Sequence, residues 1–166
     1  MPVNMFGMIS HRLASEIIAP RGPVFDHDFI RDFAQAHEQG GFDRVLVGYY
    51  SNAPDGFLVA AHAAASTERL GLLLAHRPGF VAPTVAARKL ATLDQLTRGR
   101  LAVHVISGGS DTDQRKDGDY LDHDGRYRRT DEYLDILKRV WTADGPIDHH
   151  GELYQIEGAF SEVRPA

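Results

Sequence analysis

Four segments with the pattern of a buried strand followed by a helix come one after another along this chain. The expected strands cover Phe6–Ile9, Arg44–Val47, residues 70–75 and residues 101–106. Residues 70–75 form a nearly continuous apolar run, which is typical of a parallel strand covered on both faces. Each interval between strands is long enough for the crossover helix that parallel strands need. The pattern therefore predicts an α/β fold built on a parallel sheet.

The intervals between the strands carry helix signals. Asp26 or Asp28 can cap a helix that runs to residue 38, and Asp55 can cap a second helix, because carboxylates accept hydrogen bonds from free helical N–H groups. Pro83 suits the first turn of a third helix, where its missing N–H would have no partner anyway. Apolar spacing over residues 126–142 predicts a fourth helix.

Some smaller features complete this outline. Leu58 and Leu96 are expected on the buried sides of their helices from the apolar spacing. Residues 111–122 are mostly polar and are expected to form a solvated loop. Two short runs, 147–149 and 153–156, flank a glycine and predict a small β-hairpin.

Four strand–helix units are half of an eight-stranded barrel, and a complete barrel normally needs at least about 200 residues. The sequence has 166. We therefore expect residues 1–166 to form a partial (β/α)8 TIM barrel of about four parallel βα units. The alternative fold is a small open doubly wound sheet. A half-barrel leaves sheet edges without partners, so we also expect a homo-oligomer.

Composition narrows the classes of function. The formal charge is 18 − 23 = −5, which disfavours a nucleic-acid binder. The chain has no cysteine, which excludes disulfides, thiolate metal sites and a cysteine nucleophile. His149 and His150 have no third ligand at a convincing spacing, so we expect no metal and place the pair on the hairpin surface. There is no secretory signal and no apolar run that could span a bilayer, so we expect a cytoplasmic protein with no membrane association.

Polar residues follow the expected strands at the ends where α/β proteins bind ligands. His11 follows the first strand and His76 closes the third. Ser107-Gly108-Gly109-Ser110 follows the fourth, and its glycines would let a phosphate approach the backbone, although a simple tight turn explains them equally well. His104 lies within the fourth strand, where a hydrogen-bonded core histidine is the commoner explanation.

The run from Arg77 to Tyr127 carries a family resemblance. Its motifs are Arg77-Pro78, Gly99-Arg100, Ser107-Gly108-Gly109-Ser110, Asp117-Gly118-Asp119, Asp122-His123 and Arg126-Tyr127. With these motifs the chain closely resembles the flavin-dependent alkanesulfonate monooxygenases of the bacterial luciferase-like group. The resemblance covers the amino-terminal half of the family protein. Ala53 is a departure, because several sulfonate monooxygenases carry cysteine there.

The resemblance implies which residues form the site. Tyr127 matches a tyrosine that contacts the flavin phosphate, and His104 stands where a polar residue lies beside the flavin ring. The arginines near Tyr127 could add positive potential. A cis peptide is expected at Ala75–His76. The resemblance thus suggests cofactor binding by His76, His104, Ser107, Gly108 and Tyr127, and substrate binding by His11 and Ala53.

The resemblance also implies a reaction. Reduced FMN and dioxygen would oxidise an alkanesulfonate to an aldehyde and sulfite, with a separate NAD(P)H-dependent reductase supplying the reduced flavin. The family's histidine–arginine pair lies beyond residue 166, so we assign no catalytic acid or base here and expect the isolated chain to be inactive. The alternative is a non-enzymatic half-barrel that binds flavin weakly or serves as an assembly module.

Overall fold

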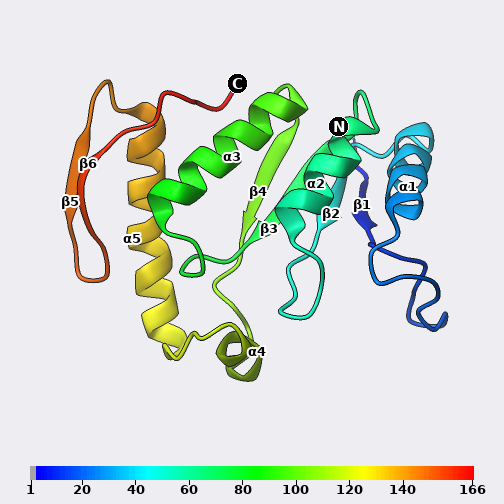
Figure 1. Ribbon diagram of the computed structural model, residues 1–166, viewed down its shortest axis with the longest axis horizontal. Helices are drawn as coiled ribbons and strands as arrows, with labels where there is room; N and C mark the ends of the chain where they lie inside the picture. Colours follow the sequence, from blue (N-terminus) through cyan, green and yellow to red (C-terminus); the bar gives the residue numbers. More distant parts are fainter. Residues whose placement is uncertain (1–2) are drawn as a thin grey trace. The chain divides into compact units, whose positions relative to one another are not determined.

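The computed structural model describes residues 3–166 (Figure 1). Two compact units divide the chain. The first, the sheet unit, runs to Ala75 and also holds Leu96–His104; the second, the helical unit, holds His76–Gln95 and Val105–Ala166. The helices are α1 (His27–Gln39), α2 (Gly56–Ala65), α3 (Pro83–Thr97), α4 (Asp111–Lys116) and α5 (His123–Thr142). The strands are β1 (Phe6–Ile9), β2 (Arg44–Val47), β3 (Gly71–His76), β4 (Leu101–Val105), β5 (Ile147–His150) and β6 (Gln155–Ala159).

The first four strands form one parallel sheet in the order β1-β2-β3-β4 (Figure 1). Gly7, Val45 and Leu72 lie side by side in its register. Consecutive order and parallel direction are what half of a (β/α)8 barrel requires, so the predicted fold class is confirmed. The predicted hairpin is confirmed too: β5 and β6 pair antiparallel, although β6 covers residues 155–159 rather than 153–156.

Helices cover one face of the sheet unit. Helix α1 packs on β1 so closely that a Cβ atom added to Gly7 would lie 2.2 Å from the His37 ring. Val45, in the same row, is fully buried. Phe6 and Met8 occupy alternate positions of β1 and are 53% and 45% exposed. Because side chains alternate along a strand, the opposite face of the sheet presents apolar groups to solvent.

The helix starts follow the predicted capping. Asp26 accepts a hydrogen bond from the Phe29 N–H at 3.0 Å, and Asp55 accepts one from the Leu58 N–H at 3.1 Å. The predicted burial of two leucines is wrong, because Leu58 is 69% exposed and Leu96 is 67% exposed. Nearly every position of α2 is apolar, so its sequence does not mark which face will be buried.

The stretch predicted as a polar loop contains α4. Ser110 caps this helix by accepting from the Asp113 N–H at 3.3 Å. A helix of six residues is too short to show apolar periodicity, so the pattern could not reveal it. No helix in the described residues, 3–166, is long and apolar enough to cross a membrane.

The Arg100 side chain joins the end of α2, the end of α3 and the residue before β3, at the edge of the sheet where the strands begin. Its Nε donates to the Thr97 carbonyl oxygen at 2.7 Å. One Nη group donates to the Leu70 carbonyl oxygen at 2.8 Å and to the Thr67 hydroxyl at 3.2 Å. The other donates to the carbonyl oxygens of Ala64 and Thr67 at 3.1 and 3.2 Å. This guanidinium group is therefore a structural clamp.

Arg100→Lys should lower the free energy of unfolding by about 2 kcal/mol or more, since an ammonium group cannot reproduce the planar fork and leaves carbonyls without donors. Urea unfolding followed by circular dichroism measures this. Arg69→Lys, at an exposed neighbouring arginine, is the control and should change the value by less than about 0.5 kcal/mol. Equal effects of the two substitutions would contradict the clamp.

Candidate functional site

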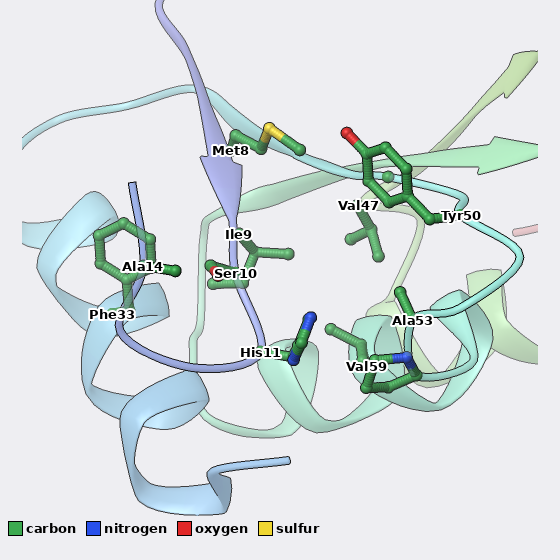
Figure 2. A pocket seen from close by; sticks show the side chains of 12 residues that line it. Met8, Ile9, Ser10, His11, Ala14, Phe33, Val47, Tyr50, Ala53 and Val59 are labelled. Atoms are coloured by element: carbon green, nitrogen blue, oxygen red, sulfur yellow. The ribbon is translucent and has the colours of Figure 1, made fainter. Parts of the chain in front are cut away.

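A cavity of about 320 Å³ opens at the carboxyl ends of β1 and β2 in the sheet unit (Figure 2). His11 and Ala53, predicted from different loops as substrate-binding residues, both line it. The geometry thus brings these two residues together, while their contact with a substrate stays a prediction. The lining residues are Met8, Ile9, Ser10, His11, Ala14, Phe33, Val47, Gly48, Tyr50, Ala53, Pro54 and Val59.

His11 is the one histidine among these lining residues. Its Nδ1 lies within hydrogen-bonding distance of the Val24 carbonyl oxygen. A carbonyl oxygen can only accept, so Nδ1 donates to it and Nε2 is the ring nitrogen left for a ligand. Figure 2 shows this ring together with Val59 and Ala53 among the side chains that line the cavity. The cavity can therefore offer one hydrogen-bonding imidazole nitrogen to a ligand.

The rest of the cavity wall is mostly apolar. Met8 and Tyr50 lie close to each other on one side of it (Figure 2). A Cβ atom added to Gly48 would lie 2.8 Å from the Tyr50 ring and 3.3 Å from the Met8 methyl carbon. Glycine at position 48 thus lets both side chains rest on the backbone. None of the lining residues is an arginine or a lysine, so the cavity suits an uncharged organic group.

The His76 side chain lies in the core of the helical unit. It is 3% exposed, and its Nε2 shares a hydrogen bond of 2.7 Å with the Tyr133 hydroxyl on α5. Burial, and secondarily the positive charge of Lys89, lower the pKa of His76 to about 4, so the ring is neutral at pH 7. Because the His76 ring is buried, only the main chain of this residue could contact a cofactor. That contact stays a prediction.

The predicted cis peptide at Ala75–His76 is wrong, since the described residues contain no cis peptide bond. β3 runs as a strand through His76, whose carbonyl oxygen accepts from the Ile106 N–H at 3.0 Å. The Ala75–His76 bond within this strand is an ordinary trans peptide.

The loop after β4 has the backbone conformation that requires glycine. Gly108 has φ +92°, a left-handed value that L side chains rarely adopt. The Ser107 carbonyl oxygen accepts from the buried amide of Gln114 at 3.0 Å. His104, on β4, is exposed and available to a ligand. No sequence pattern pointed to Gln114, because it lies in the stretch predicted to be a solvated loop.

Tyr127 lies near the start of α5 and is 58% exposed. Its ring centroid is 4.8 Å from that of His123. The phenol is therefore accessible for a ligand hydrogen bond, as its predicted role requires. His104 belongs to the sheet unit, whereas His76, Ser107 and Tyr127 belong to the helical unit. Convergence of these four residues on one cofactor stays a prediction.

The arginines near Tyr127 pair with carboxylates. Arg126 lies 2.9 Å from Asp111 and Arg129 lies 2.5 Å from Asp119, measured between nitrogen and oxygen atoms. Hydrogen bonds from Arg129 help to lower the pKa of Asp119 against the opposing effect of burial. Their positive charge is thus largely neutralised locally, and these arginines serve mainly to hold the segment around α4 against α5. Ion pairing of this kind explains why a polar segment is ordered here.

The placement of His149 on the hairpin surface is wrong. Its side chain is 13% exposed and its Nε2 donates to the Glu132 carboxylate at 3.0 Å. The same carboxylate accepts from the N–H groups of Leu153 and Tyr154 at 2.9 and 2.8 Å. His149 and Glu132 therefore fasten the hairpin to α5. Among residues 3–166 no group of three or more His, Cys, Asp or Glu side chains is arranged to hold a metal ion.

Comparison with known families gives one match over nearly the whole chain. The model of the luciferase-like monooxygenase family matches residues 3–166. This match includes both predicted substrate residues and the loop after β4.

Solved structures share the fold. An EDTA monooxygenase from Chelativorans sp. BNC1 superposes with a TM-score of 0.80 at 19% identity, over 97% of this chain and 46% of that one. The oxygenating constituent of 3,6-diketocamphane monooxygenase from Pseudomonas putida, in complex with FMN, gives 0.78 at 18% identity, over 98% and 48%. An F420-dependent secondary alcohol dehydrogenase gives 0.80 at 20% identity, over 99% and 50%. The chain thus spans about half the length of these proteins.

The lowered pKa of His76 makes stability depend on pH. The unfolded chain binds this proton near the ordinary value of 6.5 and the folded chain only near 4, so stability is complete above pH 6.5 and is lost as the pH falls toward 4. Between pH 7 and pH 5 this group should contribute about 2 kcal/mol of loss. Urea unfolding at both pH values should show a smaller loss in His76→Gln. His150→Gln, at an exposed histidine, should keep the full loss.

Proposed function

Because the chain belongs to the luciferase-like monooxygenase family, we propose that it forms part of a flavin-dependent monooxygenase that uses reduced FMN and dioxygen. The observation that carries the proposal is the cavity at the carboxyl ends of β1 and β2, which His11 and Ala53 both line. Barrel enzymes place their active sites at this end of the sheet. The glycine-rich loop after β4 supports a phosphate-containing cofactor at the same end of its strand.

The residues of this chain would fit such a cofactor in specific ways. The exposed hydroxyl of Tyr127 and the Ser107–Gly108 loop would donate hydrogen bonds to the flavin phosphate, and His104 would lie beside the ring. The flavin supplies the oxygen chemistry when it is bound, while the protein binds, orients and excludes water. His11 would offer its Nε2 to the substrate.

The substrate we propose is an alkanesulfonate, which would be converted to an aldehyde and sulfite. The apolar lining of the cavity supports binding of the alkyl group there. A sulfonate carries a negative charge and needs cationic donors, which the cavity lining does not contain. We therefore assign the sulfonate group to the remainder of a complete barrel. A separate NAD(P)H-dependent reductase would supply the reduced flavin, and the exposed apolar side of the sheet favours a homo-oligomer.

The direct test is sulfite release. A protein that joins this chain to a complete barrel should release sulfite from an alkanesulfonate when given FMN, a reductase, NAD(P)H and oxygen. The 166-residue chain alone should not, because only part of the site would be preorganised. If the complete protein binds flavin and the reductase consumes NAD(P)H, but no sulfite is released, the sulfonate assignment is refuted. Strong turnover by the short chain would show that these residues suffice.

Ala53→Leu should narrow the cavity and exclude long alkyl groups. In the complete protein, KM should rise about tenfold or more for a long-chain alkanesulfonate and change little for a short one, since the added side chain occupies space the longer group needs. Ala19→Leu, an exposed position outside the cavity lining, is the matched control and should leave both KM values unchanged. Unchanged KM values for both chain lengths would place the alkyl group elsewhere.

A further inference from the structure

Gln114 is a buried amide between the loop after β4 and the Arg77 side chain, both in the helical unit. It is 1% exposed, although it lies on the short helix α4 among solvent-exposed neighbours. Its Nε2 donates to the Ser107 carbonyl oxygen at 3.0 Å. Its Oε1 lies 3.5 Å from one Nη atom of Arg77, and the other Nη atom donates to the adjacent Asp113 carboxylate at 2.6 Å. Both ends of the amide therefore have a defined partner.

The amide also fills the space beside Gly108. A Cβ atom added at position 108 would lie 1.3 Å from the Gln114 Nε2, so no other residue fits while Gln114 stays in place. The left-handed φ of +92° requires glycine for a second, independent reason. Gly109, in contrast, has open space where a Cβ atom would be. One side of the loop is thus packed by Gln114, and the next residue faces open space.

Arg77 decides which way the amide points. A guanidinium group has only donors, so it favours the amide oxygen on its side and turns the NH2 group toward the Ser107 carbonyl. A glutamate at position 114 would keep the shape and the contact with Arg77. It would also place a second acceptor against the Ser107 carbonyl, where a donor is needed.

We propose that Gln114 is a positioning residue for the Ser107–Gly109 loop, which it holds in the conformation that receives the phosphate monoester of a flavin mononucleotide. The inference rests on the proposed function and adds to it a residue that acts through the loop rather than by touching the ligand. Preorganisation of this kind raises affinity, because the loop is ordered before the ligand binds. Its effect is confined to ligands that carry the phosphate group.

The test compares FMN with riboflavin, which has the same ring system but no phosphate. Flavin titrations of the 166-residue chain, followed by NMR chemical shifts, should show FMN affinity reduced about tenfold in Gln114→Glu and riboflavin affinity unchanged. Gln114→Met should behave alike, because it removes the donor without adding charge. Thr112→Glu adds the same charge at an exposed position of α4 and should change neither affinity. An equal loss for both flavins, or no loss, would overturn the proposal.

Amide hydrogen exchange at Gly108 and Gly109 supplies a readout that needs no ligand. Both substitutions at Gln114 should speed exchange at these two glycines while amides in the middle of α5 keep their wild-type rates. Unchanged exchange at the loop would overturn the positioning role. If the unaltered chain binds neither flavin, the cofactor proposal for this chain fails, and faster exchange in the variants would still support control of the loop by Gln114. Should Gln114→Glu fail to fold, Gln114→Met carries both measurements.

Discussion

The guanidinium group of Arg100 holds together the end of the sheet unit opposite the cavity. It satisfies carbonyl groups in the last turns of α2 and α3, which helix geometry leaves without partners, and it reaches the residue that precedes β3. This single planar cation therefore fixes how two helices end and where a strand begins. With that end secured by internal bonds, the loops at the carboxyl ends of the strands can differ in shape without loosening the sheet.

The sequence predicted the elements that depend on local signals. The bounds of β1 and β2, the caps at Asp26 and Asp55, and Pro83 at the start of α3 all follow from neighbouring residues. Helix α4 escaped prediction because its order comes from contacts outside the segment, with arginines of the β3–α3 loop and α5. The exposed Leu58 shows the converse limit, since an apolar helix does not reveal which side a sheet will cover.

The candidate site shows the same division. His11 and Ala53 could be selected because each follows a strand, and parallel strands bring such residues to one end of the sheet. The buried His76 ring depends on a hydrogen bond with Tyr133, 57 residues away in sequence, which strand periodicity cannot disclose. Gln114 is another long-range case, because its importance comes from a carbonyl group and a glycine rather than from its own chemistry.

The order of the strands has a consequence for synthesis on the ribosome. The strands lie in the sheet in chain order, from β1 to β4. When β2, β3 or β4 leaves the ribosome, the strand it pairs with has therefore already been synthesised. The sheet can thus lengthen one strand at a time during translation, with little waiting for distant partners. Arg100 emerges after the helix end at Ala64 and the strand start at Leu70 that it joins. The contacts of Arg100 therefore join segments that have all been made before β4 is added.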